Sequence, residues 1–412
     1  MARTMIRNHR LSNGLTLVSE AIPDVRSASF HILIPAGAAN EPAEKPGITA
    51  MLENVSYRGA GDRDARQLSD ALDGLGVQRG GHADVEATVF GGSLLADDLE
   101  KALEIYADIV LRPTIPPDQV EGSRQLAIQR LESVKDNPTQ RLFIDLLSVY
   151  FPGSYGRSSL GTRAGLDSVT ADALREDHHR RCVPDGAILS VAGRFDWDKL
   201  VGTVERLFGD WTGSEMMPPP PDPSGKRYHH VQEQSAQEQI GLAWADVPSN
   251  HPEYYDARIA VQVLSGGMGA RLFTEVREKR GLVYSVAAFP RAVRGAAMII
   301  AYAGTTPERR QECIDVLLHE LKRLPEGVSE EELLRARTGL LSSLVMQGES
   351  CSARAGAIVR DQFMLGRVRS LDEVREAIEK VTTSSVRDHL VAHPPRDFTV
   401  VTLGPGEVEV HE

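Results

Sequence analysis

Histidine, cysteine and acidic residues are the side chains that could hold a metal ion, and their spacing in this chain does not predict a metal site. None of the twelve histidines belongs to a His-x-x-Glu-His or His-Glu-x-x-His motif. His82 and Glu86 stand four apart, but the alternating pattern around them favours a strand, in which that spacing spans about 13 Å. The cysteines are scattered and form neither a Cys-x-x-Cys motif nor a disulfide framework: Cys182, Cys313 and Cys351.

A carboxylate lies on the helix that we expect between Gly47 and Tyr57. Apolar residues recur there at the spacing of one helix face, at Ile48, Met51, Leu52 and Val55. Glu53 lies beside this apolar stripe. From this pattern alone, its simplest interpretation is an ordinary polar residue on a half-buried helix.

The second half of the chain contains the segment LSGGMGARLFTEVREKRGLVYSV. The glycines between Gly266 and Gly269 predict a flexible turn after an apolar helix. Thr274 to Arg280 predicts a short helix that Gly281 ends before a strand. These elements by themselves need no functional explanation.

A glycine-flanked segment, Gly80-Gly81-His82-Ala83-Asp84, opens a mostly alternating stretch rich in β-branched residues. The alternation predicts a strand region. Two glycines within a strand usually indicate a bulge or the close approach of another backbone.

The elements that must position these residues occur twice along the chain. Four consecutive prolines within Ser214 to Gly225 predict an extended connector between two halves of similar length. An apolar strand ending at Gly193 has a counterpart ending at Gly404, 211 positions later, and other fragments recur at the same offset. Strands followed by runs of helices predict an α+β fold, in which each half is a mostly antiparallel sheet with helices packed on one face.

Composition limits the possible classes of function. A formal net charge of -12 and a pI near 5.5 argue against a nucleic-acid-binding protein. Such an acidic surface either attracts basic peptides or simply keeps the protein soluble. We expect no signal peptide, no membrane-spanning segment and no membrane partner, because no apolar run is long enough. The cytoplasm is therefore the expected location.

Four segments follow one another along the chain: RLSNGLTLV, GITAMLENVSYRGAG, DDLEKALEIYADIVLRPTIP and a helix ending in Asp-Asn-Pro. In this order they resemble the pitrilysin/insulinase family of zinc peptidases, in its mitochondrial processing peptidase-like branch. The resemblance extends over nearly the whole chain. It implies a duplicated fold, and we predict an N-terminal domain over residues 1–213, a linker over 214–227 and a C-terminal domain over 228–412.

Active members of this family carry His-x-x-Glu-His on the first helix, and a glutamate from a later helix completes the zinc site. The motif holds zinc because two imidazoles four apart share one helix face. The resemblance places Ala50 and Asn54 at the two histidine positions and Arg130 at the third ligand position. Only the would-be general base, Glu53, is kept. We therefore expect this chain to bind no zinc and no other cofactor, and to lack peptidase activity alone.

Other features of the family are kept. The resemblance assigns Arg277 and Tyr284 to the arginine and tyrosine that grip the substrate backbone and stabilise the oxyanion. A glycine-rich loop that contacts substrate in the mitochondrial non-catalytic subunit corresponds to Gly266, Gly267 and Gly269, although the loop here is shorter. The equivalent of the edge strand that pairs with peptide contains Gly81, His82 and Ala83.

Together these features predict the catalytically inactive subunit of a heterodimeric metalloendopeptidase. Its partners would be a homologous subunit that carries the zinc and an unfolded peptide substrate. Two alternatives stay open: a structural subunit like the zinc-less core proteins of respiratory complexes, and a homodimeric peptide-binding protein without enzymatic activity.

Overall fold

The computed structural model describes residues 5–214, 217–218, 222–223 and 225–411. The chain divides into two compact units, each described here by itself. Unit 1 consists of Met1–Ser133, Arg157–Pro219 and Gln347–Arg369, and unit 2 of Val134–Gly156, Pro220–Met346 and Ser370–Glu412. The proline-rich connector predicted over 214–227 falls partly outside the described residues.

Unit 1 is built on a six-stranded sheet in the order β1-β2-β8-β3-β7-β6. Every neighbouring pair in it is antiparallel except β2 and β8, which are parallel. A small hairpin, β4 and β5, accompanies the sheet. The strands are β1 (Met5–Arg10), β2 (Thr16–Ala21), β3 (Ser27–Ile34), β4 (Gly59–Ala60), β5 (Arg63–Asp64), β6 (Gln78–Ala83), β7 (Thr88–Leu95) and β8 (Ile188–Gly193).

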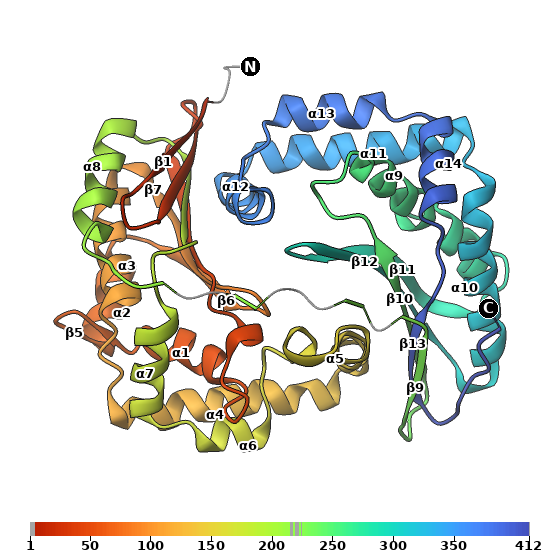
Figure 1. The fold of residues 1–412 in the computed structure, drawn as a ribbon, viewed down its shortest axis with the longest axis horizontal. Coiled ribbons are helices and arrows are strands. Elements are labelled where there is room, and N and C mark those ends of the chain that lie inside the picture. Colours follow the sequence, from red (N-terminus) through yellow and green to blue (C-terminus); the bar gives the residue numbers. More distant parts are fainter. Residues whose placement is uncertain (1–4, 215–216, 219–221, 224, 412) are drawn as a thin grey trace. The chain divides into compact units, whose positions relative to one another are not determined.

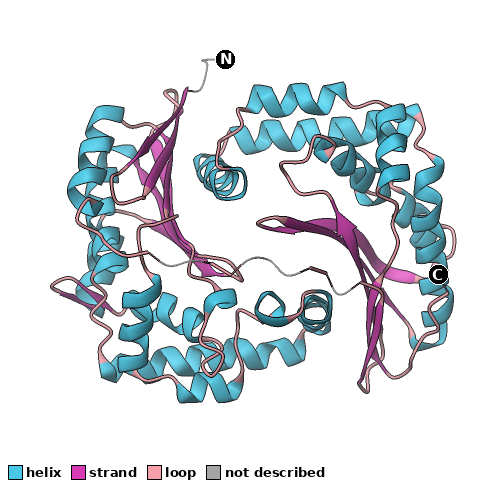
Figure 2. Ribbon diagram, viewed as in Figure 1, coloured by secondary structure: helices cyan, strands magenta, loops and turns pink. Residues whose placement is uncertain are grey.

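Most helices of unit 1 lie on one face of its sheet (Figures 1 and 2). Alternation along the strands explains how both faces are covered: Leu17 belongs to the main core, whereas its neighbour Val18 packs with Ile358 and Val359 of α12 on the other face. The helices are α1 (Ile48–Ser56), α2 (Ala65–Gly74), α3 (Leu99–Leu111), α4 (Pro117–Ser133), α6 (Arg163–Ser168), α7 (Ala171–Arg181), α8 (Trp197–Phe208) and α12 (Cys351–Leu365).

Unit 2 contains a five-stranded sheet in the order β11-β12-β10-β13-β9, again with a single parallel pair, β9 and β13. Its strands are β9 (Arg227–Gln232), β10 (Glu238–Asp246), β11 (Val283–Val293), β12 (Ala296–Thr305) and β13 (Thr399–Gly404). Its helices are α5 (Pro138–Tyr150), α9 (Tyr254–Ser265), the π-helical turn η5 (Phe273–Glu278), α10 (Arg310–Arg323), α11 (Glu330–Gly348), α13 (Leu371–Lys380) and α14 (Thr383–Ala392). Among the described residues, no helix of either unit combines the length and the apolar character needed to cross a membrane.

The two sheets repeat one topology. The order β2-β8-β3-β7-β6 in unit 1 corresponds to β9-β13-β10-β12-β11 in unit 2, with β1 as an addition. Three pairs of equivalent strands begin 211 positions apart, at Thr16 and Arg227, Ser27 and Glu238, and Ile188 and Thr399. The α+β fold of two duplicated halves is therefore confirmed, together with the predicted offset.

The compact units are not the linear halves that the sequence-based boundaries of 1–213 and 228–412 describe. Helix α5 comes from the first half of the chain but packs on β10 and β13 of unit 2. Helix α12 comes from the second half and packs on β2, β3 and β8 of unit 1. Each half of the chain thus contributes one helix to the sheet of the other half. Hydrophobic periodicity does not predict this exchange, because it shows that a helix buries one face but not which sheet that face packs against.

A buried ion pair fixes α12 on the unit 1 sheet. Arg354 of α12 donates from Nε to Oε2 of Glu20 in β2 over 2.8 Å, and both side chains are almost completely buried. Removing one member of such a pair leaves the other charge buried without a partner, which costs far more than the pair itself contributes.

We therefore expect Arg354→Ala to lower the free energy of unfolding by about 3–5 kcal/mol, as measured by urea denaturation. The matched control is Arg360→Ala, on an exposed position of the same helix, which should change stability by less than about 0.5 kcal/mol. Equal effects of the two substitutions would show that the Glu20 pair does not hold α12.

Candidate functional site: helix α1 with Glu53 and a surface arginine–tyrosine pair

Helix α1 is positioned by a glycine and a buried carboxylate at its start. Gly47 precedes the helix with a φ of 103°, a conformation that strains residues with a Cβ. Glu41 accepts hydrogen bonds from the backbone N–H groups of Gly47 (2.9 Å) and Thr49 (2.8 Å). A carboxylate at this end satisfies free N–H groups and is stabilised by the helix dipole. The helix that carries Glu53 is therefore held firmly at its start.

The residues at the predicted ligand positions lie on two helices that pack together, α1 and α4. Ala50, Glu53 and Asn54 are half-buried on α1, and Arg130 is exposed near the end of α4. Burial raises the pKa of the Glu53 carboxyl, and the nearby positive charge of Arg130 lowers it in part. The structure therefore brings the Arg130 guanidinium close enough to Glu53 to act on its ionisation.

These side chains do not fit a zinc ion. Zinc in proteins takes nitrogen, sulfur or carboxylate donors. Ala50 offers only a methyl group, and Arg130 carries a permanent positive charge that repels a cation. The Asn54 side-chain oxygen is buried and has no hydrogen-bond partner among the described residues, but an amide does not replace an imidazole. Glu53 remains as a carboxylate without the donors that would activate a water molecule.

Strand β6 forms one edge of the unit 1 sheet, next to this degenerate site. Of the strands described, only β7 pairs with it, and its residues are mostly exposed, including Gly81 and His82. A methyl group placed on Gly81 would lie 3.4 Å from Oε1 of Glu53. A hollow of about 450 Å³ is lined by both strand and helix residues, among them Glu53, Asn54, Gly80 and Gly81. The site thus opens beside a strand edge whose backbone groups can pair with another extended chain.

In unit 2, Arg277 is carried by a π-helical turn rather than by the ordinary short helix expected over 274–280. The backbone N–H of Lys279 bonds to the carbonyl of Thr274 (2.9 Å), five residues earlier. Gly281 then ends the turn with a φ of 59°, as its predicted capping role requires. Wide turns of this kind are rare and are often found at functional sites.

Tyr284 occupies a second irregularity, at the start of β11. The register between β11 and β12 shifts between Val283 and Ser285, so that Tyr284 is an extra residue in a β-bulge. Its side chain is 82 % exposed. Arg277 lies over the ring of Tyr284 at 5.6 Å and over that of Phe273 at 4.9 Å. The π-helical turn and the bulge therefore hold a guanidinium and a phenol side by side at the surface of unit 2.

The glycine-rich loop follows α9 in unit 2. Gly266 caps the helix, and Gly267 has a φ of 152° with no other group near the place of a Cβ. A small hollow of about 70 Å³ lies beside the loop, lined by Gly266, Gly267 and Gly269 together with residues of α9 and α11. The loop is thus open on one side, and its contact with substrate stays a prediction.

A cluster of possible metal ligands was missed by the sequence analysis. Glu253, His389 and His393 of unit 2 place their side-chain donor atoms within 4.8 Å of one another. The two histidines stand four apart at the end of α14, a spacing that the sequence does show. Their acidic partner is 136 residues away from His389, which is why no local motif revealed the group.

The chain matches two models of one peptidase family. Residues 16–163 match the model described as insulinase (peptidase family M16), and residues 168–340 match the model of the peptidase M16 inactive domain. The two matches adjoin within the predicted N-terminal half and together cover both helix α1 with Glu53 and the segment with Arg277 and Tyr284.

Similar proteins extend over the whole chain. The uncharacterized zinc protease YmxG of Bacillus subtilis is 27% identical over 412 residues, covering 97% of this chain and 98% of that protein. A solved peptidase M16 inactive domain from Pseudomonas fluorescens has a TM-score of 0.88 at 20% identity and covers 98% of this chain and 99% of its own. A chain of Complex III2 from Candida albicans has a TM-score of 0.86 at 20% identity and covers 97% and 96%. The two solved structures support the fold.

The half-buried Glu53 should make stability depend on pH. Its pKa is higher in the folded than in the unfolded chain, so ionisation costs stability as the pH rises above the ordinary carboxyl value, and no cost exists below it. We expect Glu53→Gln to raise the melting temperature at about pH 8 but not at about pH 4. At about pH 8, Glu53→Gln should raise the melting temperature more in a chain that already carries Arg130→Gln than in the parent chain, because the positive charge that partly compensates the Glu53 carboxylate is then absent. A gain that is the same at both pH values would contradict this account of Glu53.

Proposed function

Because the chain belongs to peptidase family M16, the insulinase family, we propose that it is a non-catalytic subunit that works with a homologous zinc-bearing subunit in peptide hydrolysis. In this role it binds an unfolded peptide and contributes Arg277 and Tyr284 to stabilising the oxyanion. Zinc is supplied by the partner. The two chains would form a heterodimer in which the partner supplies the zinc and this chain supplies Arg277 and Tyr284.

One contrast within the chain supports the proposal most. The three predicted ligand positions hold a methyl, an amide and a guanidinium, whereas the arginine–tyrosine pair is present and held by two backbone irregularities. Strained or irregular backbone is kept where surrounding structure and function require it. A subunit that needed only to fold would have no use for an exposed guanidinium on an exposed phenol.

The kept groups suit the handling of a peptide. The Arg277 guanidinium offers several charged N–H donors and the Tyr284 hydroxyl one more, and both can donate to a peptide carbonyl or to the oxyanion that replaces it. The outer edge of β6, with Gly81, His82 and Ala83, offers backbone groups for pairing with an extended peptide. Substrate would thus be recognised through its backbone rather than through one particular side chain.

A structural role is the second candidate. It is favoured by the likeness of this fold to a chain of Complex III2 from Candida albicans, a multi-subunit assembly. In that case, or in a homodimer that only binds peptide, Arg277 and Tyr284 would have no effect on any hydrolysis. The same experiment therefore separates the candidates.

The experiment is to mix the purified chain with its zinc-bearing homologue and measure cleavage of an unfolded peptide. We expect the chain to increase hydrolysis, and Arg277→Ala or Tyr284→Phe to remove most of that increase. Loss of one oxyanion donor lowers turnover by about 10²–10³-fold in well-organised sites. Both residues are exposed, so the variants should keep the stability of the parent chain.

Glu278→Gln is the matched control, because Glu278 is exposed on the same π-helical turn as Arg277. It should leave the increase in hydrolysis intact. Full activity of the pair when both Arg277 and Tyr284 are substituted would reject the shared-site proposal and favour the structural role.

A further inference from the structure

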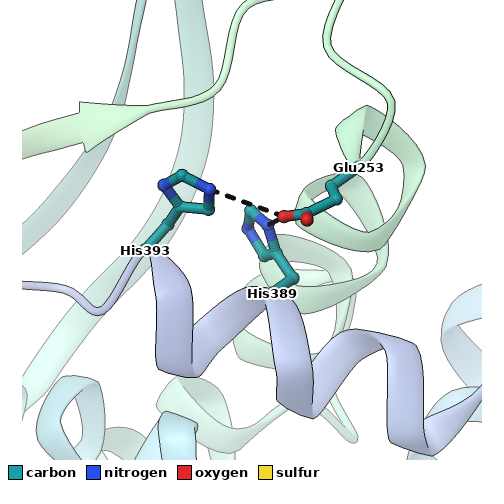
Figure 3. Close-up of side chains that lie close together, drawn as sticks. All are labelled: Glu253, His389 and His393. Carbon is teal, nitrogen blue, oxygen red and sulfur yellow. Dashed lines mark hydrogen bonds and ion pairs between the residues drawn. The ribbon is translucent and has the colours of Figure 1, made fainter.

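Three ligand-type side chains converge where α9 begins and α14 ends. Glu253 is the residue before α9, His389 lies in the last turn of α14, and His393 caps that helix. Figure 3 shows the Glu253 carboxylate with both imidazoles turned toward it. Oε2 of Glu253 lies 3.0 Å from Nδ1 of His389 and 3.5 Å from Nε2 of His393. All three residues belong to unit 2.

These separations match those of ligand atoms around a single small ion. Zinc–ligand bonds of about 2.0–2.1 Å in a tetrahedron place neighbouring ligand atoms about 3.3 Å apart. The observed 3.0 and 3.5 Å bracket that value, and the third distance, between the two histidine nitrogens, is no more than 4.8 Å. Side-chain movements of about an ångström would therefore bring all three atoms to bonding distance.

Burial also suits an ion with one open position. The His389 side chain is 3% exposed, whereas those of His393 and Glu253 are 39% and 41% exposed. The first histidine is thus fixed by packing, and the other two groups face solvent. A three-ligand site with this access leaves room for a water molecule as the fourth ligand.

The surroundings position the ligands. Nδ1 of His251 accepts a hydrogen bond from the backbone N–H of Glu253 (3.2 Å), and the His251 ring lies 5.5 Å from that of His393. Asp246, at the end of β10, lies within the electrostatic influence of both His389 and His393. Such outer groups orient metal ligands and tune their affinity.

We propose that Glu253, His389 and His393 form a binding site for a divalent transition-metal ion, with zinc as the best fit. Two imidazoles and one carboxylate are a ligand set that zinc favours, and they suit calcium or magnesium poorly. The ion would join the start of α9 to the end of α14 and so stabilise unit 2. This site is separate from the degenerate positions on α1 and α4, and it departs from the expectation that the chain binds no metal.

Cobalt(II) is a suitable probe, because a tetrahedral cobalt site gives an intense visible absorption band. We expect the full chain, first stripped with a chelator, to bind one cobalt ion with such a band, and zinc to displace it. Zinc should also raise the melting temperature, because an ion that binds only the folded state stabilises it. No band together with an unchanged melting temperature would overturn the proposal.

His393→Ala and Glu253→Gln are the decisive variants, because both side chains are partly exposed and their loss should not unfold the chain. Each should weaken binding by more than the 10–100-fold that loss of an outer-shell partner typically costs. His179→Ala, an exposed histidine of α7 in unit 1, is the matched control and should bind cobalt as the parent chain does.

Circular dichroism of each variant checks that it is folded, and we expect the spectrum of the parent chain. Binding that survives in both His393→Ala and Glu253→Gln would refute the site. Binding that is instead lost in Glu53→Gln would place the ion on α1, which would also contradict the proposed non-catalytic role. If only the metal site at Glu253, His389 and His393 is refuted, the proposed non-catalytic role of the chain is not affected.

Discussion

Burial of the Glu53 carboxyl on α1 raises its pKa, and the positive charge of Arg130 on α4 offsets this effect in part. A metal ion can bind and activate water, whereas a guanidinium can only neutralise and donate hydrogen bonds. On the proposed function, Arg130 eases the burial of Glu53 in part but cannot activate a water molecule. The proposal therefore assigns to helix α1 and the edge of β6 a role in binding peptide and none in hydrolysis.

The rest of the framework is consistent with this change. The two sheets share the order of five strands and the same single parallel pair, so unit 1 has the same scaffold as unit 2. In unit 2, two departures from regular backbone hold Arg277 against Tyr284. A guanidinium stacked on an aromatic ring loses less conformational freedom when it binds a carbonyl, which suits a group that must be ready before substrate arrives.

Sequence patterns predicted much of the fold, including the helix that carries Glu53. The 211-residue offset is visible in the chain because the equivalent strands that begin at Ile188 and Thr399 are both apolar, fully buried and end in glycine. The helix around Glu53 follows from its apolar spacing. The exchange of α5 and α12 between the halves could not be predicted from the sequence, because an apolar helix face does not indicate which sheet it packs on. The π-helical turn and the bulge at Tyr284 were also missed, since both depend on hydrogen-bond register rather than on residue type. Glu253 and His389 are far apart in sequence, and only tertiary structure brings them together.

The most direct test of the central claim is whether the purified chain cleaves an unfolded peptide by itself when zinc is supplied. The proposed site at Glu253, His389 and His393 means that metal content alone would not decide the question, whereas hydrolysis does. With Ala50, Asn54 and Arg130 in the ligand positions, we predict no cleavage above that of a heat-denatured sample of the chain. Zinc-dependent cleavage that disappears on Glu53→Gln would contradict the account, because it would show that a working metal site exists on α1.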